Sequence, residues 1–256
     1  MNKKTNALCI LGFCILCTCL TNCKETKKEK WKLSSCTSEA LAVHDDRPYA
    51  AEDSLFIASF RANIDKEMTK EVGHAAISME SGGDESLLGN MTADAILAQT
   101  KKLLGKDADI AVMNQGGLRK SISKGVLLAQ DIFYTYPFDN TLCVAYLKGK
   151  DLMKLFSKLE PNRAHAFSNV RVKVDNEKVI YAKIGGKDVD MEKTYAVASI
   201  DYLVGGGDNS NAFKHAIKIE SSTITLRDAI MDYVQTKEKK GEKLSAKLEN
   251  RVIVNK

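Results

Sequence analysis

Residues 85–119 read ESLLGNMTADAILAQTKKLLGKDADIAVMNQGGLR, and this stretch decides the fold class. Apolar residues between 87 and 104 recur at helical spacing, and Gly105 follows where such a helix would end. The short apolar run at 109–113 has the length and composition of a buried strand. We therefore predict a helix and then a strand, which runs into a glycine-containing loop at 114–119.

The sequence on either side of this stretch mixes helical and strand patterns without regular alternation. Apolar residues at four-residue spacing from Leu55 to Val72 predict an amphipathic helix. We predict a single α+β domain over residues 50–256, with a mixed β-sheet and packed helices. Further strands are expected at 74–79, 141–147, 170–174, 179–184, 195–200 and 252–254, and further helices at 152–159 and 226–234.

Composition limits the classes of partner. The chain has 256 residues, of which 44% are hydrophobic, an ordinary value for a globular protein. Its 38 basic and 33 acidic residues give a net charge of +5, which is too weak to indicate a nucleic-acid partner. The cysteines form no paired zinc-ligand pattern, since five of the seven lie within the first 23 residues.

Residues 1–22 resemble a bacterial lipoprotein signal peptide. Two lysines precede an apolar run at 7–20, which is shorter than the ~20 residues that a membrane-spanning helix needs. The run ends in Leu20-Thr-Asn-Cys23, which resembles a lipobox and implies lipid attachment at Cys23. We expect residues 23–49 to be a polar tether, and the protein to be exported and lipid-anchored in the cell envelope, on a periplasmic or surface face. A plain secretory signal is the alternative.

Three loops carry polar and aromatic residues, two of them together with glycines, and each loop is expected to follow a strand. They are residues 114–119 (NQGGLR), 134–140 (YTYPFDN) and 202–209 (YLVGGGDN). Glycine lets the backbone approach a ligand closely, while Asn, Asp and Arg side chains offer hydrogen bonds to it. Each loop alone also has a plain interpretation: a simple turn, a core position for Phe138, and a helix cap for Asp208.

Taken in this order, the three loops resemble the C-terminal, nucleotide-recognition domain of the 5′-nucleotidase family. Its members show N-x-G-G-x-R, then P-F-x-N-T, then an aromatic residue followed by G-G-D. The matching segments here are 114–119, 137–141 and 202–208. Residues 85–95 also resemble the family's E-S-x-x-G-N-x-x-A-D-A helix start, and the resemblance covers roughly residues 50–256.

The resemblance implies a role for each loop, and in the first loop Asn114 and Arg119 match the Asn and Arg that contact the base and the sugar. Phe138 and Tyr202 match the two aromatic residues that clamp the nucleobase, and Asp208 matches the residue that holds the ribose hydroxyls. The family also carries an Arg ahead of the helix start, where this chain has residues 81–84 (SGGD), so we expect weak binding. The full expected substrate-binding set is Asn114, Gly116, Gly117, Arg119, Phe138, Asn140, Tyr202, Gly206, Gly207 and Asp208.

Family enzymes also have an N-terminal metallophosphoesterase domain that binds two metal ions through D-x-H, G-N-H-D/E and H-x-H segments. None of the four histidines, His44, His74, His165 and His215, lies in such a segment. We therefore expect no catalytic residue, no metal and no cofactor in this chain, and we interpret residues 44–46 (HDD) as a solvated loop.

Two functions are consistent with these features. In the first, the chain is the nucleotide- or nucleoside-recognition part of a split 5′-nucleotidase, and a separate metallophosphoesterase chain carries the divalent metal ions. This function requires an exposed apolar surface for the partner. In the alternative, the chain is a membrane-tethered nucleoside- or nucleotide-binding protein with no role in hydrolysis. An enzyme that acts alone is disfavoured.

We predict that Cys23 carries the lipid. Mass spectrometry of the membrane-extracted protein should find a mature N-terminus at an acylated Cys23, because the short apolar run ends there. An unmodified N-terminus, or one at another residue, would contradict the lipoprotein interpretation.

Overall fold

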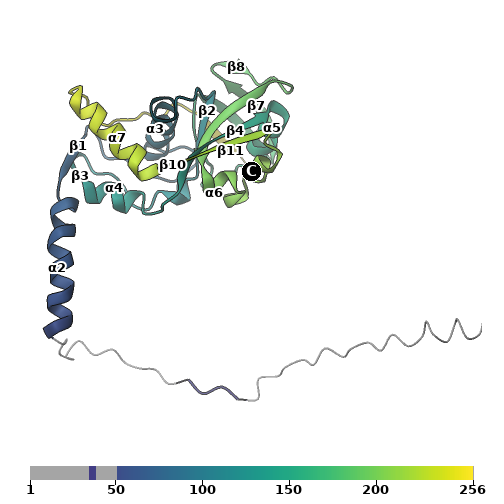
Figure 1. The fold of residues 1–256 in the computed structure, drawn as a ribbon. Helices are drawn as coiled ribbons and strands as arrows, with labels where there is room; N and C mark the ends of the chain where they lie inside the picture. Colours follow the sequence, from purple (N-terminus) through teal and green to yellow (C-terminus); the bar gives the residue numbers. More distant parts are fainter. Residues whose placement is uncertain (1–34, 39–50, 256) are drawn as a thin grey trace, which may run out of the picture. The chain divides into compact units, whose positions relative to one another are not determined.

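A computed structural model describes residues 35–38 and 51–255 (Figure 1). The predicted signal peptide, Cys23 and residues 44–46 lie outside the described residues. Residues 50–256 form one compact unit. Within the described ranges, no helix is both long and apolar enough to cross a bilayer.

The central sheet positions the candidate site. It has five strands in the order β10-β4-β9-β2-β5. β2 and β9 pair in parallel, whereas the other neighbours pair antiparallel, so the predicted mixed sheet is confirmed. The five strands are β2 (Ile110–Met113), β4 (Thr141–Lys148), β5 (Ala166–Ser168), β9 (Thr194–Ile200) and β10 (Lys218–Thr225).

Two smaller sheets complete the β-structure of the described chain. An antiparallel pair joins β1 (Glu71–Ala75) to β3 (Gly125–Leu128). The strands predicted at 170–174 and 179–184 pair as an antiparallel hairpin, and Asn176 and Glu177 have the positive φ that a tight hairpin turn needs. The hairpin belongs to a sheet in the order β11-β6-β7-β8, formed by Val252–Asn255, Val170–Asp175, Lys178–Ile184 and Lys187–Asp188.

Helix α3 (Leu87–Leu104) forms where the sequence predicts it. The Ser86 hydroxyl accepts a hydrogen bond from the Gly89 N–H at the N-terminus, and Gly105 ends the helix in the left-handed conformation. α3 packs on β2 and β5 and against α7 (Figure 1). The other α-helices are α2 (Ala51–Met68), α4 (Ala129–Thr135), α5 (Gly149–Ser157), α6 (Asp201–Val204) and α7 (Leu226–Lys239). Short 3₁₀ helices are η1 (Gln115–Gly117), η2 (Gly207–Asn209) and η3 (Asn211–His215).

The first predicted helix and the strand after it are both present, but their boundaries differ from the prediction. α2 ends at Met68, and Val72 is buried within β1 rather than on the helix. β1 itself covers 71–75 instead of 74–79, and Met79 makes only an isolated bridge to Ile122. None of the residues of α2 is buried, so its apolar residues are exposed.

The loop at 134–140 was expected to follow a strand, and this prediction is wrong. Helix α4 occupies residues 129–135, so the loop leads from this helix into β4. Tyr136 is fully buried, and its hydroxyl lies 2.7 Å from the Thr92 hydroxyl of α3. The Thr92 hydroxyl also donates to the Leu88 carbonyl at 2.8 Å, so the Tyr136 hydroxyl is the donor to Thr92. Burial raises the pKa of Tyr136. This contact joins α3 to the loop at 137–140.

Thr92→Val should destabilise the protein more than Tyr136→Phe does. Valine leaves the buried Tyr136 hydroxyl without an acceptor, which costs about 1–3 kcal/mol, whereas phenylalanine leaves the Thr92 donor satisfied by Leu88. Urea denaturation of both single variants and the double variant measures this. The double variant should be more stable than Thr92→Val alone, and the reverse order would contradict the proposed donor assignment.

Candidate functional site

The first loop places a buried amide beside a carboxylate. β2 is buried along its length and ends at Met113, so Asn114 enters the loop only 6% exposed. Its Nδ2 donates to Asp208 Oδ2 at 2.7 Å. Its Oδ1 is buried and has no hydrogen-bond partner within the described residues. Buried polar atoms are nearly always paired, so this unpaired oxygen is an unusual feature of the loop.

Gln115, which the sequence analysis did not single out, holds the neighbouring segments around this loop. Its Oε1 accepts from the Gly82 N–H at 2.7 Å and from the Ser86 hydroxyl at 2.6 Å. Its Nε2 donates to the carbonyls of Gly83 at 2.9 Å and Ala164 at 2.8 Å. The side chain therefore uses both its acceptor and its donors to fix two loops against the end of β2.

The two glycines of the first loop differ in how much space they leave for a side chain. A Cβ on Gly117 would lie 2.7 Å from Met113 Cε and 3.2 Å from Asn114 Oδ1, so a side chain there would displace both residues. A Cβ on Gly116 would meet nothing closer than the Asp208 carboxylate, at 3.7 Å. Arg119 Nη1 donates to the Gly116 carbonyl at 3.1 Å, which folds the guanidinium back over the loop.

The third loop centres on Asp208. Its carboxylate accepts from Asn114 through Oδ2 and from the Tyr202 hydroxyl through Oδ1, the latter at 2.9 Å. This hydrogen bond raises the pKa of Tyr202. Asp208 does not act as a helix cap, because it lies inside η2 with a φ of 47° and a ψ of 47°. The Tyr202 ring lies against Gly207, where a Cβ would approach the ring to 2.5 Å, so only glycine permits this packing.

The second loop is held at its base by α7 and presents Phe138 to solvent. Arg227 of α7 donates to the Tyr136 carbonyl at 3.1 Å and pairs with the Asp139 carboxylate, while the Asn140 carbonyl accepts from the Leu226 N–H at 2.8 Å. Phe138 is 48% exposed, which rules out the core interpretation. Its ring centroid lies 5.9 Å from Arg119 Cζ, within cation–π range, so this loop contacts the first one.

The first and third loops line a cleft of about 740 Å³, and the second loop reaches it through Phe138, whose ring contacts Arg119. Of the expected residues, Asn114, Gly116, Arg119, Gly206 and Asp208 line the cleft. Phe138 and Tyr202 contact cleft residues, Arg119 and Asp208 respectively, and both rings are about half exposed. That the two rings face each other across a slot stays a prediction. Gly117, Asn140 and Gly207 shape the loops and are not among the lining residues.

The segment 158–165 also lines the cleft and was not predicted; its charged or titratable lining residues are Lys158, Glu160, Arg163 and His165. They bring positive or titratable groups to the cleft, whose other wall contains Ser81 and Gly82. His165 is buried, and its Nε2 lies 2.9 Å from the Ser210 hydroxyl. Burial lowers the pKa of His165 against the opposing effect of the Asp208 carboxylate. No spacing pattern in the sequence connects these residues with the three loops.

Comparison with known proteins identifies the family. The family model for the C-terminal domain of 5′-nucleotidases matches residues 66–215. Protein UshA of Yersinia enterocolitica is 37% identical over 106 residues, which are 40% of this chain and 19% of UshA. The trifunctional nucleotide phosphoesterase protein YfkN of Bacillus subtilis is 28% identical over 230 residues, which are 81% of this chain and 15% of YfkN.

Solved structures show the same fold. The 5′-nucleotidase precursor of Thermus thermophilus matches with a TM-score of 0.67 at 24% identity, over 79% of this chain and 43% of that protein. The NAD nucleotidase of Haemophilus influenzae matches with a TM-score of 0.61 at 16% identity, over 81% of this chain and 42% of that protein. This chain thus spans less than half the length of each of these relatives. On the family match, the three converging loops and the shared fold, the chain belongs to the 5′-nucleotidase C-terminal domain family.

Proposed function

We propose that this chain binds a nucleotide or nucleoside, with the base between Phe138 and Tyr202 and the ribose on Asp208. The observation that carries the proposal is the Asp208 carboxylate, which Asn114 and Tyr202 hold at the edge of the cleft. A carboxylate accepts hydrogen bonds from both hydroxyls of a ribose. The cleft volume of about 740 Å³ lies within the range of small-molecule sites.

The aromatic and cationic groups suit the remaining parts of such a ligand. Stacking on an aromatic ring contributes about 1–3 kcal/mol per base and tolerates any base. Arg119, Lys158 and Arg163 bring positive charge to the cleft, and guanidinium groups form paired hydrogen bonds with phosphate oxygens. The Oδ1 of Asn114 is unpaired but buried, and it would accept from an N–H or O–H of the ligand after a small shift of the loop that exposes it.

The same proposal assigns this chain to a split 5′-nucleotidase that degrades nucleotides. In it, a separate metallophosphoesterase chain holds the divalent metal ions and performs hydrolysis, while this chain is lipid-anchored through Cys23 in the cell envelope. The exposed apolar residues of α2 favour this function, since exposed apolar patches mark protein interaction sites. These residues are Leu55, Phe56, Ile57, Phe60 and Ile64. The alternative, nucleoside or nucleotide capture without hydrolysis, would use the same cleft.

Phe138→Ala and Tyr202→Ala should each weaken nucleoside binding roughly ten- to a hundredfold, because each removes one stacking surface. The double variant should abolish measurable binding. Calorimetric titration with a panel of nucleosides and nucleoside monophosphates measures the effect. Tyr181→Ala is the matched control, since Tyr181 is an exposed aromatic residue on β7, outside the three loops and the cleft. Unchanged affinity in both single variants would contradict the base-stacking role.

Asp208→Asn should weaken the binding of nucleosides but hardly change the binding of the corresponding free bases, because the lost carboxylate is assigned to the ribose. Asp188→Asn, on the exposed strand β8, is the matched control. Equal losses for nucleoside and free base would place Asp208 at the base instead and overturn its assignment.

The purified chain should release no phosphate from nucleoside monophosphates, even with Mn²⁺ or Zn²⁺ present, because none of its four histidines lies in a two-metal segment of the family. A metallophosphoesterase encoded beside it should gain activity on addition of this chain. Phe56→Ser with Phe60→Ser should reduce that gain, whereas Arg61→Ser should not. Metal-dependent phosphate release by this chain alone, in proportion to its concentration, would contradict the split function. If the partner's activity does not increase when this chain is added, the capture alternative is favoured.

A further inference from the structure

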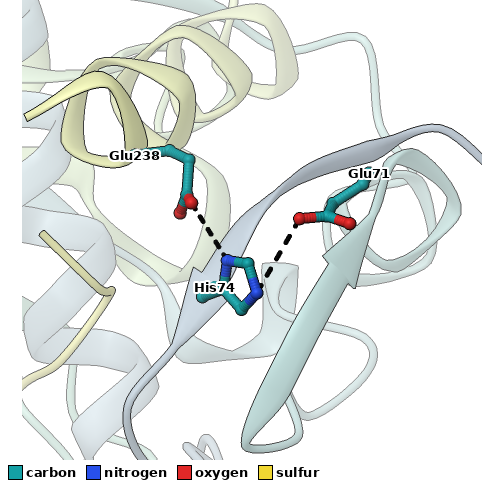
Figure 2. Close-up of side chains that lie close together, drawn as sticks. All are labelled: Glu71, His74 and Glu238. Atoms are coloured by element: carbon teal, nitrogen blue, oxygen red, sulfur yellow. Dashed lines mark hydrogen bonds and ion pairs between the residues drawn. The ribbon is translucent and has the colours of Figure 1, made fainter. Parts of the chain in front are cut away.

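Outside the nucleotide cleft, Glu71, His74 and Glu238 converge on one point of the surface (Figure 2). One potential ligand atom from each of the three lies within 4.8 Å of the other two. We propose that these residues bind a divalent transition-metal ion of the zinc type. The site is independent of the proposed function, since none of the three residues lines the cleft.

A local irregularity of β1 brings two of the ligands to one side. In a regular strand, residues three apart point to opposite faces of the sheet. The pairing of β1 with β3 shifts register between Glu71 and Gly73, and this bulge breaks the alternation. Glu71 and His74 consequently approach each other, and Glu71 Oε1 lies 3.7 Å from His74 Nε2.

The third ligand comes from α7, and Gly73 lets this helix come close. A Cβ on Gly73 would lie 2.7 Å from Val234 Cγ1 and 3.4 Å from Glu238 Oε2. Glycine at this position therefore permits β1 to pack directly against the last two turns of α7. Glu238 Oε1 then lies 3.1 Å from His74 Nδ1, so the imidazole is placed between two carboxylates (Figure 2).

The charges around the imidazole favour a bound cation. A neutral imidazole has one N–H and can donate to only one of the two glutamates. The contact with Glu238 has hydrogen-bond length, whereas the contact with Glu71 is too long. In the described part of the chain, neither glutamate forms an ion pair with a lysine or arginine. The adjacent lysines, Lys70 and Lys237, pair instead with Glu67 and Glu242.

The donor set selects the kind of ion. One imidazole nitrogen and two carboxylate oxygens, with open positions for water, suit Zn²⁺, whereas Mg²⁺ and Ca²⁺ prefer oxygen ligands alone. Ligand atoms around a tetrahedral zinc ion lie about 3.3 Å apart. Glu71 faces Nε2 and Glu238 faces Nδ1, so an ion bound to one nitrogen requires the other glutamate to swing towards it. Both glutamate side chains are exposed enough for this movement, at 56% and 41%. A bound ion would join β1 to the C-terminal part of α7.

Calorimetric titration of the full chain with ZnCl₂, after removal of any affinity tag, tests the site. His74→Gln, Glu71→Gln and Glu238→Gln should each weaken one Zn²⁺ site at least tenfold. Glu242→Gln is the matched control, because Glu242 is also an exposed carboxylate near the end of α7 but pairs with Lys237. Zn²⁺ should also raise the melting temperature of the parent chain and of Glu242→Gln, and not that of the three ligand variants.

The melting temperatures without metal show whether each variant is folded, so loss of binding is separable from loss of structure. Zn²⁺ bound by any of the seven cysteine thiols of the chain would persist in all variants and is thereby distinguished from this site. An absence of Zn²⁺ binding by the parent chain overturns the proposal. The proposal is also overturned if His74→Gln binds Zn²⁺ as tightly as the parent chain does, or if the parent chain binds Mg²⁺ as tightly as Zn²⁺.

Discussion

The Asp208 carboxylate, shared between the Asn114 amide and the Tyr202 hydroxyl, is the interaction on which the candidate site depends. It exists because β2 and β9 are parallel neighbours in the central sheet. Parallel strands have their carboxyl ends at the same edge, so the loops that follow Met113 and Ile200 leave side by side. Asn114 and Asp208 can therefore meet although 94 residues separate them in the sequence.

The antiparallel strand β4 brings the second loop, residues 134–140, to the same edge. Leu142, near the start of β4, pairs with Ile200 at the end of β9, so the residues just before β4 lie beside the loop that begins with α6. Phe138 is thereby brought within cation–π range of Arg119. The backbone of Asp208 is in the left-handed region, which costs an ordinary residue on the order of 1–3 kcal/mol. Its two side-chain hydrogen bonds help to hold this conformation.

The sequence predicted those parts of the molecule that depend on local patterns. α3, with Ser86 before it and Gly105 after it, follows from helical spacing and capping. The short elements β3, α4 and β5 have too few residues for a periodic signal, and β10 is a polar strand at the edge of its sheet. The displaced start of β1 follows from its bulge, which spacing arguments do not reveal.

The site was predictable only where the family motifs include the residue. Gln115 lies inside a recognised motif but at its variable position, so nothing marked it as the residue that fixes two loops. His165 and Arg163 reach the cleft from a segment without such a motif. The cluster of Glu71, His74 and Glu238 joins residues more than 160 positions apart, and only the packing of β1 on α7 unites them.

The most direct measurement of the central claim is a crystal structure of the chain with a bound nucleoside such as adenosine. We expect the purine ring to lie between Phe138 and Tyr202, about 3.5 Å from each ring plane. Both ribose hydroxyls should lie within hydrogen-bond distance of the Asp208 carboxylate. A nucleoside bound elsewhere, or Phe138 and Tyr202 rings that do not contact the base, would contradict the nucleotide-recognition account.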